Sequence, residues 1–276
     1  MLLDTHCHLD AAEFDRDREA MIGAARAVGV GGFLAPGVEV AGFPALTDLA
    51  RCHPDIRLAY GIHPMYAHRA QPGDLDQLAA WLSRGEALAV GEIGLDGFVT
   101  EPPMALQLAY FVPQLELARD RGLPVVLHVR RAVEAVIHQL KAVRPPGGIA
   151  HAFNGSQQQA HQLMDLGFAL GFGGAMTFPG SRRIRALAAS LPLEAIVLET
   201  DAPDIPPAWA GGGRNEPANL ARFATVLAEL RGMAMEEVAA VTTANALRVL
   251  PGWARPGAGP NPARPGIHGG LSEREA

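Results

Sequence analysis

The chain has 276 residues, of which 49% are hydrophobic and 19% are charged. This apolar content supplies a buried core and excludes an intrinsically disordered or collagen-like chain. No apolar run approaches the roughly 20 residues that cross a bilayer, so we expect no membrane partner. The first residues lack the basic region of a signal peptide, and two cysteines do not make a disulfide framework. We therefore expect a cytoplasmic protein.

The acidic charge balance limits the kind of partner. The formal net charge is −6, whereas tracking along extended nucleic acid needs a summed positive potential. Contact with a few phosphates, as at a nucleic acid end or in a small phosphodiester, stays open. We expect a monomer.

Short apolar runs alternate with segments of helical periodicity along the chain. The runs predict strands at 2–4, 32–35, 58–60, 88–91, 124–128, 148–151, 168–172 and 195–199. The segments between them predict helices at 13–28, 42–52, 75–83, 104–121, 132–143, 157–166 and 181–190, and two more follow at 217–231 and 234–249. Several strands are almost continuously apolar, which is typical of parallel strands buried on both faces.

This alternation predicts an α/β protein with the (β/α)₈ or TIM-barrel fold, as one domain over residues 1–250. A doubly wound open sheet is the alternative, but no GxGxxG turn follows the first strand. The segment 251–276 is rich in proline and glycine and has no periodicity. We expect it to be a flexible tail outside the fold.

Side chains that can bind metal stand at the C-terminal ends of five predicted strands. They are His6, His8, Glu92, His128, His151 and Asp201. Because the carboxyl ends of parallel barrel strands meet at one mouth, we expect these groups to converge. The set exceeds the needs of one tetrahedral ion and suits two divalent ions that share a carboxylate. Imidazole-rich ligation favours transition metals, and the choice among Zn, Mn, Co and Mg stays open.

Each of these residues also has a simpler interpretation when taken alone. A single histidine is more often structural than a ligand, Glu92 can pair with an arginine, and Asp201 can cap a helix. Buried unpaired charges are costly, however, and five strand ends bear such groups. Taken together, they favour the metal site.

Five segments resemble, in order and spacing, the motifs of the TatD family of metal-dependent hydrolases. They are DTHCHLD at 4–10, GEIGLD at 91–96, LPVVLHVR at 123–130, HAFNGS at 151–156, and ETDAP at 199–203 followed by RNEP at 214–217. The resemblance extends from residue 1 to about 250. The chain departs from the family pattern at Gly97-Phe98, Arg131, Ala152 and Asp204, all outside the ligand positions, which leaves the substrate open.

The resemblance implies an amidohydrolase-like barrel with a two-metal site that hydrolyses phosphodiesters, typically a DNA exonuclease. Around one ion it would place His6, His8, Glu92 and Asp201. Around the other it would place Glu92, His128 and His151.

Four residues receive further roles as hypotheses. Asp201 would act as the base that accepts a proton from the attacking water. Arg130 would hold a charged substrate group, or alternatively pair with Asp96 or Glu199. His63 would donate a hydrogen bond to substrate or leaving group, or serve only as a turn residue before proline. Asn215 would line the substrate-binding rim.

Three functions remain open at this point. The first is a nuclease or phosphodiesterase. The second is an amidohydrolase or deacylase that acts on a carbon-centred amide or ester, since both reactions need an activated water and a Lewis acid. The third is a non-catalytic barrel that metal merely stabilises, which a complete ligand set with a candidate base disfavours.

Overall fold

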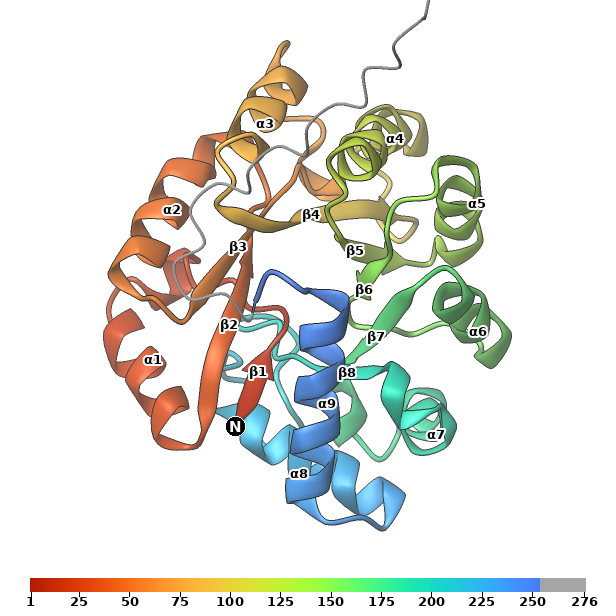
Figure 1. Cartoon of the computed structure of the whole chain (residues 1–276). Coiled ribbons are helices and arrows are strands. Elements are labelled where there is room, and N and C mark those ends of the chain that lie inside the picture. The colour runs from red at the N-terminus through yellow and green to blue at the C-terminus, as the bar shows by residue number, and fades with distance from the viewer. Residues whose placement is uncertain (254–276) are drawn as a thin grey trace, which may run out of the picture.

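The computed structural model describes residues 1–253. Its sheet has eight parallel strands that pair in chain order, with the helices in a ring around them (Figure 1). The strands are β1 (Leu2–Asp4), β2 (Val30–Pro36), β3 (Ile56–Tyr60), β4 (Ala87–Asp96), β5 (Val125–Arg130), β6 (Gly148–Ala150), β7 (Phe168–Phe172) and β8 (Ile196–Leu198). The helices are α1 (Arg18–Ala27), α2 (Phe43–Cys52), α3 (Asp74–Leu82), α4 (Met104–Arg121), α5 (Val133–Val143), α6 (Gln157–Asp165), α7 (Arg182–Ser190), α8 (Asn219–Arg231) and α9 (Met235–Val249). The predicted TIM barrel is confirmed.

Backbone hydrogen bonds join the first strand to the last. The Thr5 amide donates to the Leu198 carbonyl at 3.1 Å, and the Asp201 amide donates to the His6 carbonyl at 2.8 Å. The sheet therefore closes on itself, which excludes the open doubly wound alternative. The second bond also fixes the segment after β1 against the segment after β8.

One apolar side chain from each strand fills the barrel interior near its N-terminal end. These side chains are Leu3, Leu34, Ala59, Ala89, Val126, Ile149, Ala169 and Val197. The end of α9 closes this layer together with Trp253, which is only 6% exposed. Residues 251–253, which we expected in the tail, therefore belong to the barrel, because the large indole is buried there. The rest of the predicted tail lies outside the described residues.

The polar residues of the barrel mouth form the next layer toward the C-terminal ends of the strands. Side chains two positions apart on a strand point to the same face. Each of three polar residues follows an interior residue by two positions: His128 on β5, His151 directly after β6 and Glu199 directly after β8. The same alternation that buries the apolar layer therefore directs these three side chains into the mouth.

Strand β4 is longer than predicted and changes its alternation partway along. Ala89 belongs to the interior layer, whereas Ile93 packs with the outer cluster that contacts the helices. The register against β5 shifts between Val90 and Ile93. This shift moves Glu92, rather than Ile93, to the inside of the barrel.

The helices of residues 1–253 include none that combines the length and the apolarity of a membrane span. The segment before α1 also differs from the prediction, because α1 begins at Arg18 instead of residue 13. The Arg18 side chain donates to the carbonyls of Leu9 and Ala11. This arginine ties the long segment after β1 to the start of α1 and so supports the segment that carries His6 and His8.

Candidate metal centre

The Glu92 carboxylate lies at the centre of five histidines in the barrel mouth, and its side chain is 2% exposed. Oε2 lies 3.1 Å from Nε2 of His6 and 3.5 Å from Nε2 of His8. Oε1 lies within 3.0–3.5 Å of a ring nitrogen of three other histidines, which are His63, His128 and His151. The two oxygens of one carboxylate therefore face two separate groups of donors.

The first group contains four donor atoms arranged as the corners of a small polyhedron. Nε2 of His6 and Nε2 of His8 are 3.2 Å apart, and each lies 3.5 Å from Oδ1 of Asp201. A tetrahedron with metal–ligand bonds of about 2.0–2.2 Å has edges of about 3.3–3.6 Å. With the two distances to Oε2 of Glu92, five edges of 3.1–3.5 Å come close to those of such a polyhedron, so His6, His8, Glu92 and Asp201 fit one divalent ion.

The second group depends on an imidazole that lies between two carboxylates. Nδ1 of His128 is 3.0 Å from Oε1 of Glu92, and Nε2 is 3.0 Å from Oδ2 of Asp96. A neutral imidazole has only one N–H, so one contact needs an added proton or a cation. A carboxylate that holds the outer nitrogen is typical of metal-binding histidines. Asp96 therefore belongs to the site, although it was predicted only as a possible salt-bridge partner of Arg130.

His151 repeats this arrangement on the neighbouring strand. Its Nε2 lies 3.5 Å from Oε1 of Glu92, and its Nδ1 lies 3.3 Å from Oε1 of Glu199. This role of Glu199 was not predicted from the sequence. The signal was its position two residues after the interior Val197, on the same side of β8 as the site.

His63 joins the cluster from the segment after β3. Its Nδ1 accepts a hydrogen bond from the Met65 amide, which leaves the ring hydrogen on Nε2. Nε2 lies 3.3 Å from Oε1 of Glu92. Burial lowers the pKa of His63 to about 4 and keeps the ring neutral. His63 was predicted to donate a hydrogen bond to substrate or leaving group. In this arrangement, however, its Nε2–H points to Glu92.

The surroundings favour the ionised form of Glu92 and the protonated form of His151. Burial opposes ionisation of Glu92, but the surrounding His63, His6 and His151 outweigh it and hold the pKa well below its usual value. Burial likewise lowers the pKa of His151, but attraction by Asp201 and Glu92 outweighs it and raises that pKa to about 10. The buried cluster thus carries anionic oxygens and displaceable protons, as a cation site requires.

Asp4 fixes the two segments that carry the first group. Its carboxylate accepts from the His6 amide at 3.3 Å and from the Thr200 amide and hydroxyl at 2.9 and 2.6 Å. Complete burial raises the pKa of Asp4 to about 8. This residue therefore links the backbone before His6 to the backbone before Asp201.

Asp201 has a backbone conformation that few residues adopt. Its φ is +59°, in the left-handed region where aspartate and asparagine are better tolerated than most residues. Burial raises the pKa of Asp201, but His151, His8 and His6 outweigh it and hold the pKa below its usual value. A cavity of about 20 Å³, enough for one water molecule, borders Asp201 and Glu199.

Arg130 lies on the rim above the second group. Its guanidinium stacks 3.8 Å from the centre of the Phe98 ring, and Arg131 lies 4.6 Å from the same ring. Within residues 1–253, no salt bridge joins Arg130 to Asp96 or Glu199, so that alternative is wrong. Arg130 is exposed, so its charge is accessible to solvent at the rim.

Asn215 does not lie on the rim as predicted, because its side chain is completely buried. Nδ2 donates to the carbonyls of Thr200 and Ile205 at 2.7 and 3.2 Å. Oδ1 accepts from the Glu216 amide at 2.8 Å. The amide thus holds the segment around Asp201 instead of offering its hydrogen bonds to substrate.

Replacing Asn215 with alanine is expected to lower the free energy of unfolding by about 2–4 kcal/mol, because two buried carbonyls each lose a donor. Urea denaturation of the metal-free protein measures this loss. An unchanged denaturation midpoint combined with a raised KM would instead support a role in substrate binding.

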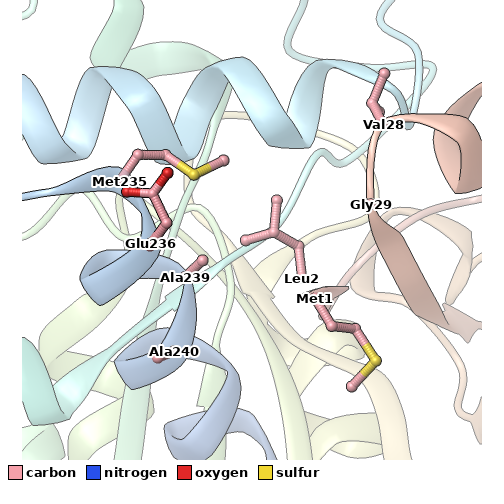
Figure 2. Close-up of a pocket in the computed structure, with 8 residues that line it drawn as sticks. All are labelled: Met1, Leu2, Val28, Gly29, Met235, Glu236, Ala239 and Ala240. Atoms are coloured by element: carbon pink, nitrogen blue, oxygen red, sulfur yellow. The ribbon is translucent and has the colours of Figure 1, made fainter.

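Another cavity, of about 200 Å³, lies at the opposite end of the barrel (Figure 2). It lies between the N-terminus and α9, and its lining includes Leu2, Val28 and Met235. Glu236 is its single ionisable side chain. Without converging polar groups it does not resemble a catalytic site, and the metal centre remains the candidate.

Comparison with known proteins gives the family. The family model described as "TatD related DNase" matches residues 3–251. The chain belongs to the TatD family. It is 39% identical to the metal-dependent hydrolase YjjV of Escherichia coli over 240 residues, 86% of this chain and 93% of that protein.

Further relatives agree with this assignment. The metal-dependent hydrolase YabD of Bacillus subtilis is 34% identical over 252 residues, 91% of this TatD-family chain and 99% of YabD. The crystal structure of YjjV superposes with a TM-score of 0.87 at 37% identity, covering 91% of this chain and 98% of that one. The protein is therefore a metal-dependent hydrolase of the TatD family.

Proposed function

We propose that this hydrolase cleaves phosphodiester bonds at nucleic acid ends. In this proposal two divalent ions bind, one on each side of Glu92, and Asp201 acts as the base. The observation that carries the proposal is the division of the Glu92 carboxylate, with Oε2 toward His6 and His8 and Oε1 toward the other histidines. The family description "TatD related DNase" supports the choice of substrate.

The proposal assigns a donor set of this chain to each ion. His6, His8, Glu92 and Asp201 would hold the first, and Glu92, His128 and His151 the second. When bound, such ions supply Lewis acidity toward the phosphoryl oxygens and make a water molecule more acidic. Zn, Mn, Co and Mg remain candidates.

In this proposal Asp201 receives the proton of the attacking water. Its carboxylate faces the first donor group through Oδ1 and borders the water-sized cavity. Its low pKa keeps the group ionised before the reaction. The strained backbone of Asp201, fixed by Asn215, directs the carboxylate to this position.

The rim over the second group fits a nucleotide. Arg130 and Arg131 bring positive charge to the mouth of a protein that is acidic overall. Phe98, over whose ring both guanidiniums lie, is 49% exposed, and a base that displaces one of them can stack there. Phosphate contact and base stacking therefore lie on the same side of the mouth.

Arg130→Gln is expected to lower kcat/KM on a phosphodiester by about 10–100-fold, because a charge-assisted hydrogen bond of roughly 1.5–3 kcal/mol is lost. Hydrolysis rates of bis(4-nitrophenyl) phosphate and single-stranded DNA measure the effect. The matched control is Arg222→Gln, on α8 and stacked on Trp209. Equal losses for both variants would contradict the role of Arg130.

A parallel assay of the metal-reconstituted protein tests the function itself. The substrates are single-stranded DNA, RNA, a simple phosphodiester and a panel of acyl esters and amides. We expect turnover of the phosphodiesters, with DNA preferred. Turnover confined to acyl substrates would support the amidohydrolase or deacylase alternative and contradict the proposal.

A further inference from the structure

Glu199 lies among buried polar atoms that lack hydrogen-bond partners. Within residues 1–253, the buried side-chain atoms without a partner are His6 Nδ1, His151 Nδ1, Glu199 Oε2 and Arg231 Nε. The first three belong to one cluster, because a donor atom from each of these residues lies within 4.8 Å of the others. A buried polar atom without a partner is costly, so three of them in one place point to a function.

The two histidines of this cluster serve different donor groups. Nε2 of His6 faces Oε2 of Glu92 and Asp201, whereas Nε2 of His151 faces Oε1 of Glu92. Their rings stack 3.9 Å apart at 19°. An imidazole that binds a cation through Nε2 carries its hydrogen on Nδ1. Both Nδ1 atoms then need an acceptor, and an oxygen of Glu199 lies within 4.8 Å of a nitrogen of each ring.

The barrel is built to hold the Glu199 carboxylate in that place. Oε1 accepts a hydrogen bond from the Ala152 amide, directly after His151. Gly171 on β7 lies beneath the carboxylate, and a β-carbon at this position would clash with it. Side chain and backbone thus confine Glu199 against the two stacked rings.

We propose that Glu199 is a positioning residue that accepts hydrogen bonds from Nδ1–H of both His6 and His151, and so tunes both metal sites at once. The inference rests on the proposed function in that both histidines bind ions through Nε2. A third cation between these residues is disfavoured, because the Nδ1 atoms would already carry hydrogens. Among the histidines of residues 1–253, the Asp96 carboxylate, in contrast, contacts His128 alone.

The test compares two matched variants, Glu199→Gln and Asp96→Asn, in the full-length, metal-free protein. Each is titrated with cobalt(II), followed by calorimetry and by the visible absorption of the ion. A neutral amide offers one acceptor oxygen and cannot serve two imidazoles as a carboxylate does. We expect Glu199→Gln to weaken both binding steps by about 10–100-fold and Asp96→Asn to weaken only one. The cobalt spectrum of Glu199→Gln should differ from that of the wild type at both binding steps.

Gly171→Ala gives an independent check, because it displaces the Glu199 carboxylate without changing any charge. We expect it to weaken both steps as well, and thermal melting of the metal-free variants shows whether they fold. The proposal is overturned if Glu199→Gln weakens one step or none. It is also overturned if the wild type binds a third cobalt ion that Glu199→Gln loses. A wild type that binds no cobalt would instead refute the proposed function.

Discussion

Replacing Glu92 with glutamine is expected to lower phosphodiester hydrolysis by about 1,000-fold or more and to weaken binding of both ions. Within residues 1–253, Glu92 is the one carboxylate whose two oxygens face the two donor groups. Its loss removes several kcal/mol of charge stabilisation, and each 1.36 kcal/mol or so is a factor of ten in rate. Glutamine keeps the shape of the side chain and leaves the fold intact. Steady-state rates and metal content after dialysis measure the two effects.

The control for this prediction is Glu236→Gln, the same change on α9 at the opposite end of the barrel. We expect wild-type rates and metal content for this variant. If Glu92→Gln retained both ions and hydrolysed substrate within about tenfold of the wild type, Glu92 would not be the bridging ligand.

Replacing Asp201 with asparagine is expected to lower turnover by about 100–10,000-fold, the usual contribution of a general base. Asparagine tolerates the positive φ of this residue, whereas alanine would add backbone strain to the loss of the carboxylate. The donor group on the Oε1 side of Glu92 does not include Asp201. The ion held by His128 and His151 should therefore remain bound while turnover is lost.

Single-turnover rates at saturating metal separate this loss from weaker metal binding. Asp204→Asn is the control, because it removes a carboxylate from the same segment at an exposed position. We expect its rate to stay within a few-fold of the wild type. Turnover by Asp201→Asn within the same range, at full metal content, would show that another group accepts the proton.

The sequence predicted the barrel and the convergence of the six candidate ligands for one physical reason. Parallel strands that alternate with helices close into a barrel, and every strand end then opens on the same mouth. His128 and His151 could be placed there because each ends an apolar strand. Their role as ligands stays a prediction that metal analysis must test.

Other features depend on contacts that no local pattern encodes. The shift of alternation in β4 that moves Glu92 inward arises from its register against β5. The contact of Asp96 with His128 joins the neighbouring strands β4 and β5, whereas that of Glu199 with His151 joins the ends of β8 and β6 across β7. For Asn215 the sequence predicted a role that the contacts do not support. An asparagine near the mouth suggested substrate binding, but its side-chain amide donates to two backbone carbonyls.

The end of the domain was also misplaced. Proline and glycine after α9 favoured a tail from residue 251, but Trp253 packs beneath the interior layer of the barrel. A single large apolar side chain in a polar, irregular segment gives no periodicity, so its burial could not be predicted from the pattern.

Anomalous diffraction from crystals of the manganese- or zinc-loaded protein tests the central claim most directly. We predict two peaks per chain on either side of the Glu92 carboxylate, about 3.5–4 Å apart. One peak should lie among His6, His8 and Asp201 and the other beside His128 and His151. A single peak, or two peaks without Glu92 between them, would contradict the two-metal account.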